Sequence, residues 1–323
     1  MTRKKISTLR RLRNRVTDRI ARVLVQLVAR LPLSALHRLG SWVGWCFIHW
    51  PNRQRRNALI NLKLCLPHLD QEALVRLRDR NLIEFGKTYL EIGYLWLRPL
   101  DQVQALVREV RGAEYLRREP GKGLIVLSPH LGAWELAGLH LARQGPTAIF
   151  YKPQRYLDSL ILTARRRCGA QLAPITARGI RVLVQALERG DYVGVLPDQE
   201  PKEDKGAVFA PLFGIPAFTM LLVNRLARRT GAPVIFMFAE RLPGAAGFRM
   251  HCIPAPAGID SADDVIAATA LNRGIEQCVS ICPEQYVWPY KRFRRRPSGL
   301  PGVYGGPLDD HGVIALIDSQ PHS

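Results

Sequence analysis

The residues best suited to do chemistry are a histidine and a glutamate in the segment His130-Leu131-Gly132-Ala133-Trp134-Glu135. The apolar run 123–127 before this segment is typical of a buried strand, and Pro129 ends that strand. Loops at strand ends carry the chemistry of many α/β enzymes, because the scaffold behind them is rigid. A histidine can take a proton from an alcohol near neutral pH, and a carboxylate on its other ring nitrogen would fix the tautomer and stabilise the imidazolium. The pair therefore predicts activation of a hydroxyl group.

The hydroxyl that such a pair activates is expected to come from the substrate. No Ser or Cys of this sequence lies in a nucleophile elbow such as G-x-S-x-G. This absence favours direct transfer of an acyl group to an alcohol. The alternative is that His130 only caps the next helix, since a histidine and a glutamate at this spacing are common by chance.

Short β-like runs alternate with helical runs in the second half of the chain. The expected strands cover residues 124–127, 147–151, 192–196, 233–239 and 248–253. The expected helices cover residues 131–143, 158–168, 180–189, 220–230 and 262–282. Strands separated by helices of this length predict βαβ units. The predicted class is therefore α/β, with a mostly parallel sheet flanked by helices.

Several charged residues follow these strands, at the same edge of the predicted sheet as His130. They are Lys152, Asp198, Arg178 and the run Arg165-Arg166-Arg167. The carboxyl ends of parallel strands meet at one crevice, where ligands bind in open α/β folds. An arginine there could stabilise the oxyanion of a tetrahedral intermediate or hold a substrate phosphate. The alternatives are a solvated helix face for two of the three consecutive arginines, and a helix or turn cap for Asp198.

The charge of the chain is strongly positive and unevenly distributed. There are 47 Lys and Arg against 27 Asp and Glu, which gives a formal net charge of +20. Residues 1–60 hold fourteen basic residues and one acidic residue, and a second basic block covers residues 291–296 next to the aromatic segment 286–290. Such charge indicates a polyanionic partner: nucleic acid, anionic lipid headgroups, or a phosphorylated or acidic substrate. Aromatic rings beside basic residues suit single-stranded nucleic acid or a lipid interface.

The N-terminal segment has the pattern of a membrane-associating helix. Apolar residues recur at three- and four-residue spacing from Ile6 to Leu31, opposite an arginine-rich face, and Pro32 closes the run. The next apolar run, residues 39–50, contains three tryptophans but would span only about 18 Å as a helix, too short to cross a bilayer unaided. Residues 1–50 are therefore expected to lie on the inner leaflet; the alternatives are a tilted or hairpin insertion into the bilayer and an ordinary helix pair on a soluble domain.

Two further features complete the reading of the residues. The six cysteines are scattered in apolar segments without zinc-type spacing, so they are expected to be reduced core residues in a cytoplasmic setting, and no metal is implied. Residues 206–217 form an apolar segment punctuated by Pro and Gly. This segment is expected to be a loop that lines an acyl-chain groove or packs on the surface.

These motifs, in this order, resemble those of the bacterial lipid A biosynthesis acyltransferases of the late, lauroyl/myristoyl type. The resemblance runs from about Arg56 to Tyr304. It rests on the segments 56–67, 130–135, 151–153, 178–179, 198–199, 209–219 and 283–297. It implies a glycerolipid-acyltransferase-like α/β fold. The patterns along the chain predict this domain over 51–304, with a helical lead-in over 51–118 and an α/β core over 119–297. Membrane-associating helices over 1–50 precede it, and an irregular tail over 305–323 follows it.

The resemblance also implies an activity and a location. Such enzymes act at the cytoplasmic face of the inner membrane of a Gram-negative bacterium. They move a fatty acyl chain from acyl-carrier protein (occasionally acyl-CoA) to a hydroxyl of a Kdo-bearing lipid A precursor. The implied partners are acyl-carrier protein, the anionic lipid A precursor and the membrane surface, with no nucleic acid and no cofactor. The catalytic histidine and acid of the family match His130 and Glu135; the basic residue after the tyrosine is Lys152 here, where the family often has arginine.

The expected mechanism gives each of these residues a role. His130 is the general base, Glu135 orients it, and an arginine, Arg165, or a loop amide holds the oxyanion while the donor thiol leaves without a covalent intermediate on the enzyme. The family's downstream arginine matches either Arg165 or Arg167. Lys152, Arg167, Arg178 and Asp198 complete the predicted substrate-binding set. The alternatives are another glycolipid or phospholipid acceptor, a non-catalytic basic protein that binds membranes or nucleic acid, and a degenerate acyltransferase fold that acts as a scaffold.

Overall fold

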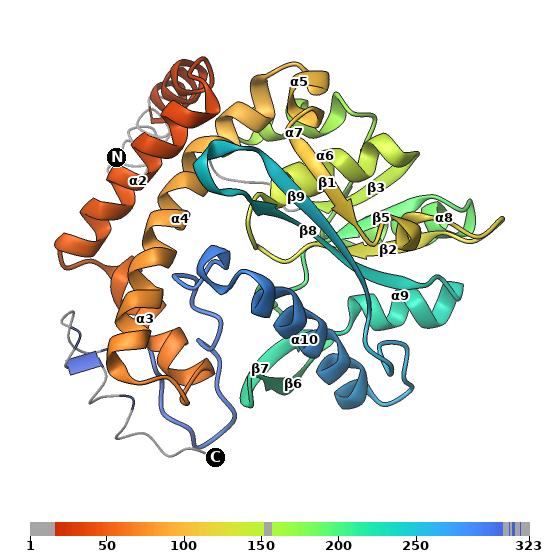
Figure 1. Cartoon of the computed structure of the whole chain (residues 1–323). Helices are drawn as coiled ribbons and strands as arrows, with labels where there is room; N and C mark the ends of the chain where they lie inside the picture. The colour runs from red at the N-terminus through yellow and green to blue at the C-terminus, as the bar shows by residue number, and fades with distance from the viewer. Residues whose placement is uncertain (1–16, 152–156, 306–309, 311, 314–316, 318–323) are drawn as a thin grey trace, which may run out of the picture.

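Seven strands form one sheet at the centre of the computed structural model, which describes residues 17–151, 157–305, 310, 312–313 and 317 (Figure 1). The strand order is β1-β9-β8-β2-β5-β3-β4, and every neighbouring pair is parallel except β8 and β9. The strands are β1 (Val107–Arg111), β2 (Leu124–Leu127), β3 (Thr147–Tyr151), β4 (Gln171–Pro174), β5 (Tyr192–Val195), β8 (Val234–Arg241) and β9 (Phe248–Pro254). The predicted mostly parallel sheet is confirmed.

Helices cover both faces of this sheet because its central strands are apolar on both sides. The residues of β2 alternate between two cores: Ile125 and Leu127 pack with Phe236 on one face, and Leu124 and Val126 pack on the other. The first face is covered by α8 (Ala177–Glu188), α9 (Leu222–Thr230) and α10 (Asp264–Ile281). The second face is covered by α6 (Trp134–Gln144), and α7 (Asp158–Arg166) packs beside it. These five helices confirm the five predicted between the strands, with ends that differ by a few residues.

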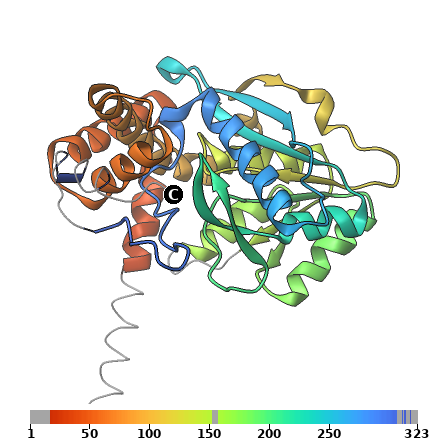
Figure 2. The same cartoon turned by 90° about the horizontal axis from the view of Figure 1, so that it is seen from below.

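The first third of the chain gathers as helices on one side of the α/β unit (Figure 2). These are α2 (Leu33–His49), α3 (Arg53–Cys65), α4 (Gln71–Leu97) and the short α5 (Leu100–Gln104), and residues 17–28 are also helical. The α2 and α4 backbones touch, since a Cβ built on Gly86 would lie 2.2 Å from the carbonyl oxygen of Gly40. Only glycine allows such a close approach. Residues 17–28 correspond to part of the predicted amphipathic helix, whose first part lies outside the described residues.

One prediction of local structure was wrong, and the strand β1 was not predicted. The segment expected to be a loop is a β-hairpin of β6 (Ala207–Leu212) and β7 (Ile215–Met220), which packs against α10. Its two turn residues, Phe213 and Gly214, have φ of 51° and 79°. Two positive φ values in a two-residue turn match the twist of a hairpin, so the turn that looked like a loop signal in fact joins two strands. The helical lead-in also contains a strand, β1, which pairs with the distant β9 and therefore had no local signal.

Among the described residues, no helix combines the length and the apolar character that crossing a membrane would need.

Candidate active site

His130 and Asp198 form a hydrogen-bonded pair at the carboxyl ends of two adjacent strands. His130 follows β2 and Asp198 follows β5, and these strands pair in parallel from Leu124↔Tyr192 to Leu127↔Val195. The His130 Nδ1 atom lies 2.7 Å from the Asp198 Oδ1 atom, and the His130 backbone N–H donates to Oδ2 at 2.9 Å. The carboxylate therefore fixes both the ring and the backbone of His130.

The environment of Asp198 keeps its carboxyl group ionised. The residue is only 2% exposed. Burial alone would raise its pKa, but the charge and hydrogen bonds of His130 outweigh this and hold the pKa below its usual range. An ionised carboxylate accepts the Nδ1 proton, which leaves the Nε2 lone pair of His130 to act as a base. The Gln199 side-chain amide lies 3.1 Å from this Nε2 atom.

Backbone hydrogen bonds clamp the loop that carries His130 between β8 on one side and residues 285–287 on the other. The Ala133 N–H donates to the carbonyl of Ala239, at the end of β8, at 2.8 Å. The Gly132 N–H donates to the carbonyl of Gln285 at 3.1 Å, and the Val287 N–H donates to the carbonyl of His130 at 3.1 Å. Gly132 has φ of +58°, and a Cβ there would lie 2.0 Å from the Ala239 oxygen. A glycine is required at this position because any side chain would push the loop off β8.

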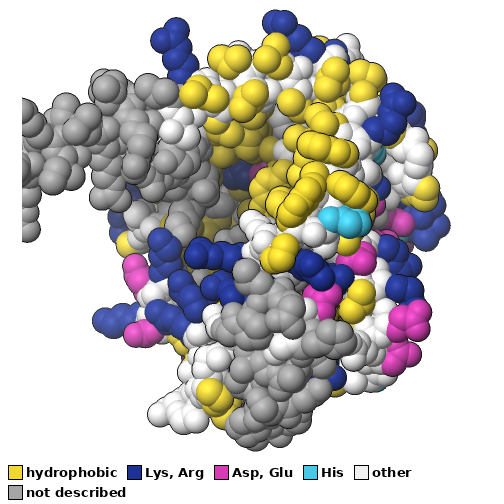
Figure 3. Space-filling view, turned by 90° about the vertical axis from the view of Figure 1, so that its left-hand side faces the viewer, with side chains coloured by type: hydrophobic (Ala, Val, Ile, Leu, Met, Phe, Trp, Pro, Cys, Tyr) yellow, Lys and Arg dark blue, Asp and Glu magenta, His cyan; other side chains and the backbone are white. Residues whose placement is uncertain are grey.

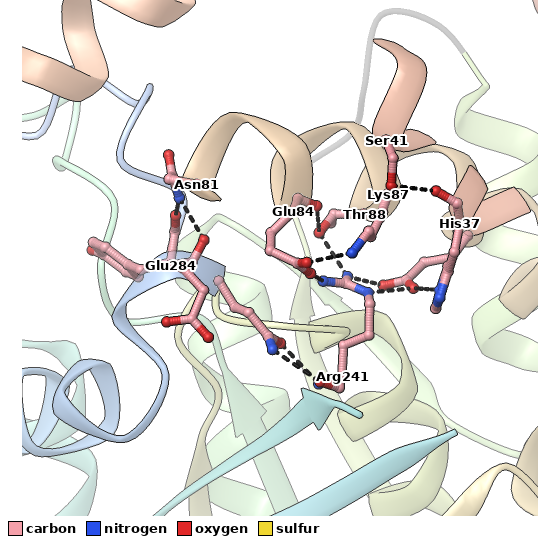
Figure 4. A network of polar contacts seen from close by, with 11 residues as sticks. His37, Ser41, Asn81, Glu84, Lys87, Thr88, Arg241 and Glu284 are labelled. Atoms are coloured by element: carbon pink, nitrogen blue, oxygen red, sulfur yellow. Dashed lines mark hydrogen bonds and ion pairs between the residues drawn. The ribbon is translucent and has the colours of Figure 1, made fainter. Parts of the chain in front are cut away.

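The Ala239 and Gln285 sides of this clamp are joined by Arg241 (Figure 4). The Gln285 side chain binds the Arg241 backbone twice, accepting from its N–H at 2.8 Å and donating to its carbonyl at 2.9 Å. The Arg241 side chain, 2% exposed, binds the Glu84 and Glu91 carboxylates of α4, and Glu91 also binds His37 of α2 at 2.9 Å. A continuous polar network therefore runs from α2 to the His130 loop. No local sequence pattern predicts this network, because its members lie far apart along the chain.

Glu135 lies in the first turn of α6 and binds a different cation from the one expected. Its carboxylate accepts from the Arg165 Nη2 at 2.5 Å and from the Trp96 Nε1 at 3.0 Å. Burial would raise the Glu135 pKa, but Arg165 outweighs burial, and His130 contributes in the same direction, so the pKa lies below its usual range. The hydrogen bond to His130 that was expected from Glu135 comes instead from Asp198. Glu135 acts on His130 only through its nearby charge.

The comparisons with known proteins decide the family of this chain. The family model for "Bacterial lipid A biosynthesis acyltransferase" matches residues 3–295. The chain belongs to this family. The predicted resemblance is therefore confirmed, and the protein is an acyltransferase of lipid A biosynthesis.

Individual relatives agree with the family match. The chain is 28% identical to a lipid A biosynthesis lauroyltransferase of Escherichia coli (strain K12) over 283 residues, which cover 86% of this chain and 91% of the relative. It is 29% identical to a palmitoleoyltransferase of the same organism over 281 residues, with the same coverage. It is 30% identical to a lipid A biosynthesis acyltransferase of Haemophilus influenzae over 270 residues, which cover 81% of each chain.

The other predicted site residues of the acyltransferase are spread more widely. Arg165 joins the site through Glu135, whereas Arg167 donates to the backbone carbonyls of Leu95 and Arg98 and so ties α7 to α4. Arg178 is exposed in the first turn of α8. Lys152 lies outside the described residues.

An apolar pocket of the acyltransferase opens beside the buried ion pair. Its polar lining residues are Glu135, Arg165 and Ser128, and the rest of its lining is mostly apolar side chains and glycine backbone. The wall residues include Val126, Ala137, Gly138, Leu141, Ile149, Gly194, Leu196 and Met237. A Cβ built on Gly138 would meet only the Ile149 Cδ1 atom, at 4.0 Å, so this helix position borders open space. In the described part of the chain, no group of three or more His, Cys, Asp or Glu could hold a metal ion.

Proposed function

We propose that this protein moves a fatty acyl chain from an acyl-carrier-protein thioester to a hydroxyl of a Kdo-bearing lipid A precursor. The observation that carries the proposal is the His130–Asp198 hydrogen bond of 2.7 Å, which leaves Nε2 as the ring nitrogen that can accept a proton. The adjoining apolar pocket supports it, because a pocket lined by aliphatic side chains suits a fatty acyl chain. Membership of the lipid A acyltransferase family supports the choice of acceptor.

In the proposed reaction His130 removes the proton of the acceptor hydroxyl through Nε2. The acceptor oxygen attacks the thioester carbonyl carbon, and the resulting tetrahedral oxyanion is held by Arg165 or a loop amide. The carbon–sulfur bond then breaks, and the imidazolium of His130 returns its proton to the leaving thiolate. Asp198 holds the His130 ring, while Glu135 positions Arg165 and adds negative charge that stabilises the imidazolium.

The charge of the chain supports this choice of partners. A net charge of +20 would attract both an acidic carrier protein and a phosphorylated lipid. Arg178, exposed on α8, and Lys152 remain proposed contacts for these anionic partners. We propose no nucleic-acid partner, because the apolar pocket beside the base has no role in binding nucleic acid.

We also propose that the protein sits on the cytoplasmic face of the inner membrane through its N-terminal helices. Large hydrophobic side chains are exposed together on this side of the molecule, and Figure 3 shows them with Lys and Arg side chains along their border. They are Ile20, Val23, Leu24, Leu27, Leu31, Leu39, Trp42, Trp45, Trp50 and Tyr89. Exposed tryptophans beside cations suit the headgroup layer of an anionic membrane.

The first test is a mass-spectrometric assay of detergent-solubilised protein. The donor is acyl-carrier protein with a fatty acyl chain, and the acceptor is a tetra-acylated, Kdo-bearing lipid A precursor. We expect the acceptor to gain one acyl chain, and His130→Ala to lower turnover by about 10²-fold or more. His68→Ala, which removes an exposed histidine far along the chain from the site, is the matched control and should retain wild-type turnover. Normal turnover in a folded His130→Ala variant would disprove the assignment of the base.

A further inference from the structure

The basic block 291–296 contains two kinds of cation. Arg294 and Arg295 are paired with carboxylates: the Arg294 Nη2 lies 2.7 Å from the Glu200 Oε1, and the Arg295 Nη1 lies 2.5 Å from the Asp204 Oδ1. The Arg295 backbone N–H also donates to Glu200 at 2.8 Å. The charge of these two arginines is therefore already balanced within the protein.

The other three cations of the block, Lys291, Arg292 and Arg296, have no carboxylate within ion-pair distance among the described residues. Arg292 is 3% exposed and donates to the Phe218 carbonyl at 2.8 Å and to the Thr219 hydroxyl at 3.0 Å, while its Nε atom is buried without a partner. Arg296 is partly buried, and its Nε and Nη1 atoms are buried without a partner. Burial accordingly lowers the pKa of Arg296. Buried cations without an anion are costly, so this arrangement lacks its counter-charge.

Tyr304 holds the middle of this block. The Lys291 ammonium lies 5.5 Å from the centroid of the Tyr304 ring. The phenol itself is fixed, because it accepts from the Phe293 N–H at 3.1 Å and also binds Asn61. Arg292 and Arg296 are one and three residues from Phe293 in the chain, so all three cations belong to one short segment anchored at this ring. Like charges gathered on one short segment repel one another, and a bound anion would relieve that repulsion.

The cluster lies close to the reacting groups. The Val287 N–H binds the carbonyl of His130, and Lys291 follows Val287 by four residues, a span of at most about 14 Å. Arg294 and Arg295 both bind the Glu200 carboxylate, and Glu200 comes two residues after Asp198. The Glu200 backbone N–H also donates to the Tyr290 hydroxyl oxygen at 2.9 Å. An anion bound here would belong to a molecule that also reaches His130.

We propose that Lys291 and Arg296, with Arg292 behind them, form an anion subsite that takes a phosphate ester of the glycolipid acceptor. This inference rests on the proposed function. A partly buried guanidinium can be reached by a small group on a flexible ligand, whereas the carboxylates of a carrier protein would meet the exposed cations first. A phosphate monoester offers two charges and several acceptor oxygens to an ammonium and a guanidinium. The phosphate of the donor's pantetheine arm has the same chemistry, and the test separates the two sources.

The test measures KM separately for acceptor and donor in Lys291→Gln and Arg296→Gln. Each variant should raise the KM for the phosphorylated acceptor by about tenfold or more, the effect of one lost charge-assisted hydrogen bond, with kcat and the donor KM unchanged. Acceptor that has been dephosphorylated by a phosphatase should be used equally by wild type and variants. Arg294→Gln is the matched control, because Arg294 is exposed and already paired, and it should retain the wild-type KM. Thermal unfolding verifies that each variant is folded.

Three results would overturn the subsite: a rise in the donor KM instead, an equal loss with dephosphorylated acceptor, or an equal loss in Arg294→Gln. A binding titration with glucosamine 1-phosphate, with glucosamine as the neutral control, separates this inference from the proposed function. Binding that disappears in Arg296→Gln would support the subsite even if no lipid were acylated. Binding that is unchanged in Arg296→Gln would overturn the subsite even if acyl transfer were observed.

Discussion

Asp198 and Glu135 are two buried carboxylates in one site, and they hold different partners. Asp198 binds the ring and backbone of His130, and Glu135 binds Arg165 and Trp96. In both, burial alone would raise the pKa, and the charge and hydrogen bonds of the partners lower it further than burial raises it. The site therefore uses negative charge twice. One carboxylate orients the proposed base, and the other neutralises and places an arginine.

The backbone explains this division. Asp198 follows a strand that pairs directly with the strand before His130, so its carboxylate reaches both His130 N–H groups. Glu135 is separated from His130 by the Gly132 turn and by the first residue of α6. Its side chain therefore meets α4 and α7, which supply Trp96 and Arg165.

The largest expected effect comes from changing the carboxylate that aims the base. Asp198→Asn should lower kcat by about 10²- to 10⁴-fold, because the amide no longer fixes the tautomer or stabilises the imidazolium. Single-turnover kinetics at saturating donor and acceptor measure this loss. If Asp198→Asn were fully active while Glu135→Gln was inactive and folded, the assignment of the two carboxylates would have to be exchanged.

The second carboxylate should matter more for stability. Glu135→Gln leaves Arg165 buried without its ion-pair partner and should lower the free energy of unfolding by about 3–5 kcal/mol. The double variant Glu135→Gln/Arg165→Met should recover much of that loss, because no unpaired charge stays buried. Its activity should nevertheless stay low, since Arg165 is proposed to hold the oxyanion. Chemical denaturation and turnover of the single and double variants measure both effects.

The loop between the two carboxylates gives a smaller effect. Gly132→Ala places a Cβ on a residue with φ of +58°, against the Ala239 carbonyl. We expect a loss of about 2 kcal/mol in stability and a lower kcat with nearly constant KM, because the loop must shift off β8. Gly138→Ala is a fitting control, since a Cβ there meets open space. Equal effects of the two changes would argue against the clamp.

The smallest expected effect is a pH dependence of stability. Both carboxyl groups have lower pKa values in the folded protein than when unfolded. Their stabilisation is therefore complete above the unfolded pKa values, about 4, and is lost as the pH falls through the lower folded values. Wild type should lose stability more steeply than Asp198→Asn below pH about 4. Urea unfolding at a series of pH values measures the difference, and parallel curves for the two proteins would contradict it.

Much of the site was predictable because its signals are local. The apolar run at 124–127 and the breaker after it placed His130 at a strand end, and the structure has β2 at those residues. Asp198 was expected at the same edge of the sheet, because the carboxyl ends of parallel strands lie together. The partners of Glu135 were not predictable, because Trp96 and Arg165 come from helices that are distant in sequence. The clamp by Gln285 and Arg241 was missed for the same reason.

The sequence by itself determined most of the elements, the family resemblance and the place of His130 at a strand end, because periodicity, breakers and short motifs depend on neighbouring residues. The tertiary structure decided which carboxylate binds His130. That choice depends on the adjacency of β2 and β5, which brings together two residues 68 positions apart. It also decided which cations of the block 291–296 are neutralised, since Glu200 and Asp204 reach only Arg294 and Arg295. Hydrogen bonds and ion pairs act over a few ångströms, so only the folded chain can assign them.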